Sequence, residues 1–127
     1  MTTRGDTRPI PELPPEAVSR LYDGSNRVAY AIAIEIVEGL RRDPAPMLEH
    51  ARHWLERHSS AYPPDRMMWV ELLNGPVEDL CRQLLRLDDR GELLRDTMPS
   101  FGAMDEDRRM AIARATWSAA RGPGDTR

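Results

Sequence analysis

Proline, glycine and aspartate divide this chain into short segments, and their spacing limits what it can fold into. Asp43-Pro44, Pro63-Pro64-Asp65 and Gly75-Pro76 each stand just before an apolar run. Proline is favoured at the first position of a helix, and an aspartate just before a helix can cap its free N–H groups. Each signal therefore predicts the start of a helix, and no apolar run has the clean alternation of a half-buried strand.

The most apolar segment, residues 26–42, is expected to form the central helix. Apolar residues fall on two adjacent lines at a spacing of four, which is the spacing of one helix face; the lines are Val28, Ile32, Ile36 and Leu40, and Ala29, Ala33 and Val37. Valine and isoleucine also favour strands. The alanines, a capping Ser25 and the length of the segment favour a helix, and its broad apolar surface predicts burial on several sides.

The same signals predict six or seven mostly short helices, over residues 14–23, 26–42, 44–57, 65–74, 76–85, 88–96 and 105–120. Short helices joined by tight corners cross at steep angles, which predicts an all-α fold, a single compact irregular (orthogonal) bundle. Residues 1–13 and 121–127 are polar or rich in proline and glycine. We expect a disordered N-terminal arm at 1–13, a helical domain at 14–120 and a disordered tail at 121–127.

The composition indicates the cellular compartment and excludes some kinds of catalysis. A chain of 127 residues with 40% apolar and 31% charged residues is the size of one soluble domain. The single Cys81 cannot form an internal disulfide, and no apolar stretch is long enough to span a membrane, so we expect a cytoplasmic protein without membrane contact. All 18 basic residues are arginine, which excludes a Schiff-base lysine and a phosphate-binding loop lysine.

The histidines His50, His53 and His58 lie close together in the sequence. Their spacing is that of neither a zinc protease nor a zinc finger, and a metal site needs three or four convergent ligands. A solvated polar face opposite the Trp54 stripe is the better explanation, because a histidine pair alone rarely supplies enough ligands. We therefore expect no metal site and no cofactor.

Arg52 and His58, with five residues between them, resemble the Arg-x4–6-His signature of the HEPN family of helical ribonucleases. The resemblance implies that Arg52 would stabilise the scissile phosphate and that His58 would act in acid–base chemistry, without a metal. With 18 arginines and three histidines in the chain, on the order of one such match arises by chance. A HEPN-type endoribonuclease is therefore the alternative hypothesis.

Two residues stand out within apolar stripes. Glu35 interrupts the most apolar segment, and a buried carboxylate needs a partner, for which arginine is the available cation besides histidine. The sequence predicts a structural Arg–Glu pair there, with a functional carboxylate as the alternative. Cys81 lies between Leu80 and Leu84 in an apolar stripe, so we expect a buried core residue rather than a nucleophile.

The chain's only phenylalanine, Phe101, lies in an expected loop between Pro99 and Gly102. A phenylalanine in a short loop either fills a gap in the core or anchors a partner. Both interpretations stand at this point.

The stretch from Trp69 to about Arg114 resembles a family of small, uncharacterised bacterial helical proteins. The residues that carry the resemblance are Trp69, Leu72, Leu73, Gly75-Pro76, Leu93 to Arg95, Pro99-Ser100-Phe101, and Arg108-Arg109 leading into Ile112. The family tends to have a Pro-Phe pair followed by glycine, and here Ser100 intervenes. The resemblance implies a companion protein encoded in a cassette of toxin–antitoxin type, with a protein-binding or regulatory role.

These observations lead to a non-enzymatic helical protein-interaction module, antitoxin-like or otherwise regulatory, as the first hypothesis. The expected partner-binding residues are Phe101 with Met98 and Met104 as an apolar patch, rimmed by Arg95 and Arg108. The expected partner is another protein, and the sequence leaves open whether the chain forms a homo-oligomer. The net charge of −3 argues against a general nucleic-acid binder, although Arg108, Arg109 and Arg114 could contact phosphate.

Overall fold

The computed structural model describes residues 8–58 and 63–121, and the described part of the chain is helical without any strand. Within these residues seven helices follow one another: α1 (Pro15–Arg20), α2 (Gly24–Arg42), α3 (Pro44–Arg57), α4 (Pro63–Asn74), α5 (Val77–Leu84), α6 (Asp89–Asp96) and α7 (Glu106–Arg121). The predicted all-α bundle of short helices is confirmed. None of the described helices is both long and apolar enough to cross a membrane.

Aspartates cap α6 and α7, as the sequence predicted, whereas the side chain of Asp43 makes no capping bond at α3. The Asp88 carboxylate accepts from the Gly91 N–H at 3.1 Å, and the Asp105 carboxylate accepts from the Arg108 N–H at 2.9 Å. At α2 the cap is Asp23, whose carboxylate accepts from the Ser25 N–H at 2.9 Å, rather than Ser25 itself. These bonds satisfy N–H groups that have no partner inside the helix.

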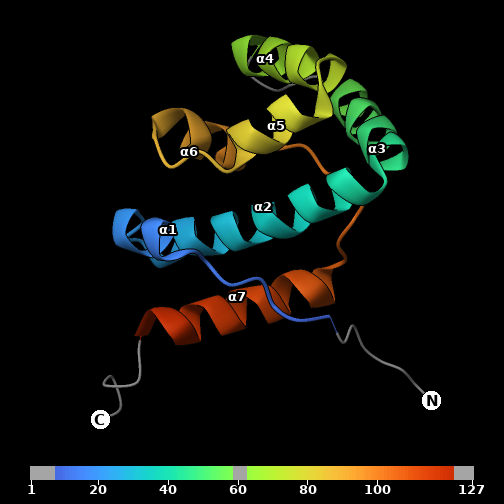
Figure 1. Ribbon diagram of the computed structural model, residues 1–127. Helices are drawn as coiled ribbons and strands as arrows, with labels where there is room; N and C mark the ends of the chain where they lie inside the picture. Colours follow the sequence, from blue (N-terminus) through green and yellow to red (C-terminus); the bar gives the residue numbers. More distant parts are fainter. Residues whose placement is uncertain (1–7, 59–62, 122–127) are drawn as a thin grey trace, which may run out of the picture.

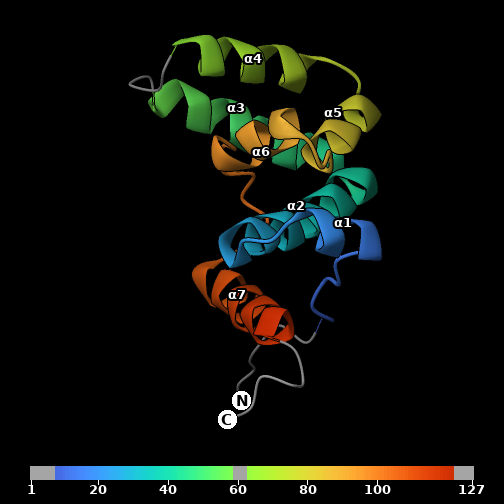
Figure 2. The ribbon, with the colours of Figure 1, turned by 90° about the vertical axis from the view of Figure 1, so that its left-hand side faces the viewer.

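Helix α2 lies in the middle of the molecule, as predicted. Figures 1 and 2 show α3, α5 and α6 on one side of it, α4 outermost on that side, and α7 on the opposite side. Contacts of α2 with α3, α5, α6 and α7 account for its burial on several sides. The core therefore extends through both layers, and α7 is held mainly by α2.

The first described residues, 8–13, form an extended segment that we call the N-terminal segment. It crosses beside α2 and α7 (Figure 1), and Ile10 and Leu13 pack against the core. The sequence had assigned these residues to a disordered arm, and that assignment is corrected for 8–13. Residues 1–7 and 122–127, the rest of the expected arm and tail, lie outside the described residues.

Candidate interaction surface

Phe101 is a core residue. It comes from the connection between α6 and α7, and its side chain is 2% exposed. Its ring meets the buried Trp69 edge to face, with 6.4 Å between ring centroids. Trp69 in turn donates its Nε1–H to Thr97 Oγ1 at 2.9 Å. Phe101 therefore fills the space between this connection and α4, and cannot anchor a partner in this structure.

The connection that carries Phe101 is fixed by His50 on α3. A His50 ring nitrogen is 3.0 Å from the Ser100 carbonyl oxygen. The same ring packs on Gly102, whose φ of 71° is the left-handed conformation that glycine adopts without strain. His50 thus has a structural role, which the spacing of the histidines did not reveal.

The other residues of the predicted patch are also drawn inward. Arg95 is 6% exposed, donates to the carbonyl oxygens of Leu84 and Arg86 at 2.9 and 2.6 Å, and lies over the Tyr30 ring. Met98 and Met104 are half-buried against the core. An arginine that finds carbonyl acceptors can be buried without an opposite charge. The expected exposed patch around Phe101, rimmed by Arg95 and Arg108, is therefore not formed.

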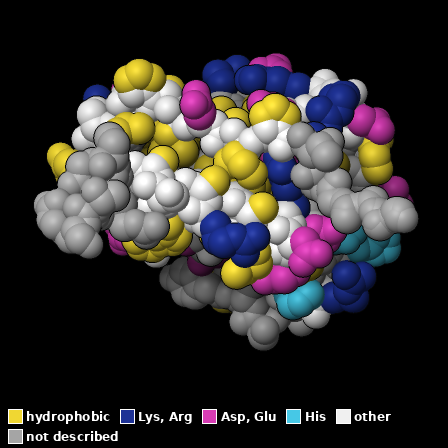
Figure 3. Space-filling view, turned by 90° about the horizontal axis from the view of Figure 1, so that it is seen from below, with side chains coloured by type: hydrophobic (Ala, Val, Ile, Leu, Met, Phe, Trp, Pro, Cys, Tyr) yellow, Lys and Arg dark blue, Asp and Glu magenta, His cyan; other side chains and the backbone are white. Residues whose placement is uncertain are grey.

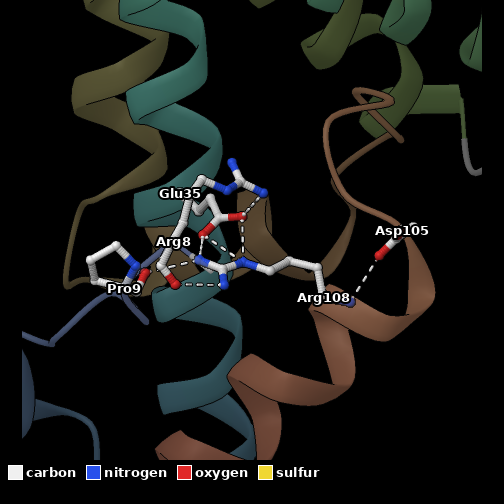
Figure 4. A network of polar contacts seen from close by, with 5 residues as sticks. All are labelled: Arg8, Pro9, Glu35, Asp105 and Arg108. Carbon is white, nitrogen blue, oxygen red and sulfur yellow. Dashed lines mark hydrogen bonds and ion pairs between the residues drawn. The ribbon is translucent and has the colours of Figure 1, made fainter. Parts of the chain in front are cut away.

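Arg108 and Glu35 form the buried ion pair that the sequence predicted at Glu35. They are 3% and 5% exposed, and Arg108 Nε donates to both Glu35 oxygens at 3.1 and 3.0 Å. Figure 4 shows the pair between α2 and α7, with Arg8 on the same carboxylate at 3.2 Å. The pair joins α7 to α2 and reaches the N-terminal segment.

Arg52 and His58 do not share a site. Arg52 donates to the Leu73 carbonyl oxygen at 2.9 Å and lines a cavity of about 180 Å³ between α3 and α4, which His58 does not line. The His58 ring stacks on Trp54 at 4.0 Å and also has a ring nitrogen 2.8 Å from the Trp54 carbonyl oxygen. The two side chains thus have separate structural partners, and nothing in this arrangement supports the ribonuclease hypothesis.

The structure also bears on the two other chemical candidates, a reactive Cys81 and a metal site. Cys81 is buried, and burial raises the pKa of its thiol, which disfavours the reactive thiolate. No group of three or more His, Cys, Asp or Glu side chains could hold a metal ion within residues 8–58 and 63–119.

Large apolar side chains are exposed on α4 (Met67, Val70), α6 (Leu93) and the first half of α7 (Met110). Three more lie at the end of the molecule where α1 leads into α2 and α7 finishes. Tyr22 is 88% exposed, Trp117 is 44% exposed and Val18 is 41% exposed. Val18 also lines a cavity of about 570 Å³, whose other apolar walls are Ile10, Pro11, Leu13, Ala115 and Ala119. We call Val18, Tyr22 and Trp117 the α1–α7 surface. Figure 3 shows hydrophobic side chains exposed on the side of the molecule that carries α7.

Gly24 determines how Trp117 sits on this surface. A Cβ atom on Gly24 would lie 2.3 Å from the Trp117 ring, so the glycine lets the indole lie directly on the start of α2. We expect Gly24→Ala to destabilise the protein by about 1–3 kcal/mol, because the ring or the helix must move. Thermal unfolding of Gly24→Ala beside the wild type tests this. Unchanged stability would show that Trp117 does not pack against Gly24.

The α1–α7 surface offers apolar and aromatic contact area, which suits non-covalent recognition. No protein-family model matches this chain, and no curated protein or solved structure matches it either.

Proposed function

We propose that this chain is a non-enzymatic protein-interaction module that docks a partner protein on the α1–α7 surface. The observation that carries the proposal is the exposure of Tyr22 and Trp117 at the end of the molecule that also holds the apolar cavity of about 570 Å³. Tyrosine and tryptophan are enriched among the residues that dominate binding energy, and they lose little conformational entropy when they are covered.

Exposure sets Tyr22 apart from the other aromatic side chains within the described residues. Tyr30, Trp69 and Phe101 are each at most 4% exposed, and Trp54 is occupied by the His58 ring. A tyrosine that is 88% exposed contributes almost nothing to the fold. Its side chain is therefore available for a contact with another molecule.

The finer part of the proposal concerns the partner. We propose that the chain is a regulatory companion, antitoxin-like in the sense that it binds and modulates a protein encoded beside it. The resemblance of residues 69–114 to small bacterial companion proteins supports this role. Because Phe101 is buried, the proposal assigns the docking site to Tyr22 and Trp117 instead.

The experiment is capture of the partner by the tagged full-length chain from lysate of the cells that encode it, followed by titration of the purified partner. We expect Tyr22→Ala to weaken partner binding by about 2 kcal/mol, which is about thirtyfold in Kd. The free energy of unfolding of Tyr22→Ala, measured by thermal unfolding, should stay within about 0.5 kcal/mol of that of the wild type.

Met67→Ala is the matched control. Met67 is 70% exposed on α4, on the opposite side of the molecule from α7 (Figure 1). This variant should bind the partner as the wild type does. Equal loss in both variants, or loss in Met67→Ala alone, would contradict docking at the α1–α7 surface.

A further inference from the structure

The N-terminal segment forms a wall between two cavities. On one side is the apolar cavity of about 570 Å³, and on the other is a polar cavity of about 540 Å³ that Glu35, Glu38 and Arg42 line from α2. Ile10, Pro11 and Glu12 line both cavities. Without the segment, the two cavities would form one groove along α2 and α7.

Part of the hold on the segment is through its backbone. Arg108 donates from Nη1 to the Arg8 carbonyl oxygen at 3.1 Å and from Nη2 to the Pro9 carbonyl oxygen at 2.9 Å (Figure 4). Contacts to backbone carbonyls do not depend on which side chains the segment carries. Recognition of extended peptides commonly uses such main-chain bonds for affinity and side-chain pockets for specificity.

Three side chains of the segment supply the specificity. Arg8 pairs with Glu35 at 3.2 Å, and Ile10 and Leu13 pack against the core. Pro9 and Pro11 favour the extended conformation. An occupant of this groove therefore has a recognisable chemistry, which is an arginine followed two and five positions later by apolar residues, with prolines between them.

The ion pair of Arg8 is the weak part of the hold on the segment. Arg8 is 46% exposed, and half-exposed ion pairs contribute little to stability. Glu35 does not depend on Arg8, because Arg108 pairs with the same carboxylate from inside the protein. The groove would therefore keep its charge pair when the segment leaves.

We propose that this groove binds an extended, proline-containing, arginine-bearing segment of a partner protein, and that the chain's own residues 8–13 occupy it in the free protein as an autoinhibitory segment. The proposal rests on the proposed function as an interaction module, and adds the kind of partner and its regulation. Binding of the partner segment would displace residues 8–13.

A synthetic peptide tests this directly. The probe is fluorescein-labelled Arg-Pro-Ile-Pro-Glu-Leu-Pro-Pro, the sequence of residues 8–15, titrated with the full-length chain and followed by fluorescence anisotropy. We expect the double variant Arg8→Ala with Ile10→Ser to bind the peptide about tenfold more tightly than the wild type, because its own segment competes less. Circular dichroism checks that the variant is folded.

The matched control lies in the peptide, where folding of the protein is not affected. A peptide that has glutamate in place of its arginine should lose binding, because its carboxylate would face Glu35. Equal binding of both peptides, or equal Kd values for the wild type and the double variant, would overturn the proposal. The proposal would also be overturned if the arginine peptide bound neither the wild type nor the double variant.

Two other outcomes separate this inference from the proposed function. If the peptide fails to bind while partner capture still depends on Tyr22, the groove proposal alone is overturned. If the peptide binds as expected but partner capture does not depend on Tyr22, the groove proposal is supported. Only the proposal of docking on the α1–α7 surface is then overturned.

Discussion

Phe101→Ala is expected to lower the free energy of unfolding by about 3–5 kcal/mol, because the truncation leaves a cavity beside Trp69 that the surroundings fill only in part. Phe101 is 2% exposed, and its ring contacts Trp69 edge to face. Its loss also removes a ring that helps to hold the connection between α6 and α7. Urea unfolding of the purified variant measures the effect.

Phe101→Leu provides the comparison. Leucine fills most of the same volume, so the loss should be clearly smaller than for alanine. If Phe101→Ala leaves stability unchanged and instead abolishes partner binding, Phe101 is an anchor after all, and the docking surface proposed at Tyr22 and Trp117 is wrong.

Arg108→Ala is expected to destabilise the protein by a similar amount, about 3–5 kcal/mol, because it leaves Glu35 as a buried carboxylate without its inner partner. Arg108 is 3% exposed and Glu35 is 5% exposed. The substitution also removes both donors to the backbone of Arg8 and Pro9. Urea unfolding reports the stability, and the rate of limited proteolysis before α1 reports release of the N-terminal segment.

The double variant Glu35→Leu with Arg108→Met separates charge burial from packing. Replacing both members of a buried pair by apolar residues of similar size is often close to neutral. We therefore expect the double variant to be more stable than Arg108→Ala. A double variant as unstable as Arg108→Ala would mean that packing volume, or the bonds to the N-terminal segment, carries the effect rather than the unpaired carboxylate.

Local signals in the sequence were sufficient for the helices and for the central position of α2. Caps and prolines act on neighbouring residues, so Asp88 and Asp105 mark helix starts without knowledge of the fold. The broad apolar surface of residues 26–42 likewise predicts that other helices cover this helix on several sides. The partner of Glu35 was predicted as an arginine, but which arginine depends on how α7 crosses α2.

The N-terminal segment could not be predicted in this way. Arg108 holds it from a position 100 residues away in the sequence, and its composition resembles that of a disordered arm. The signal that could have found it is the pair Ile10 and Leu13, which are apolar residues among prolines. Such residues need cover, and the core provides it.

The candidate site shows the same limit. Phe101 and Arg95 have the composition of an exposed hot spot, but tertiary packing surrounds the ring and provides carbonyl acceptors for the guanidinium. Tyr22 carried no sequence signal, because a tyrosine between two helices is as easily buried as exposed. Its exposure follows only from where α1 and α2 meet.

The most direct test of the central claim, that a partner docks on the α1–α7 surface, is site-specific photo-crosslinking. The photoreactive residue p-benzoylphenylalanine replaces Tyr22 in one full-length protein and Met67 in another, and both are irradiated in lysate of the cells that encode the chain. We predict that one protein crosslinks strongly at position 22 and not at position 67. Crosslinking at position 67 alone, or equal crosslinking at both positions, would contradict the account.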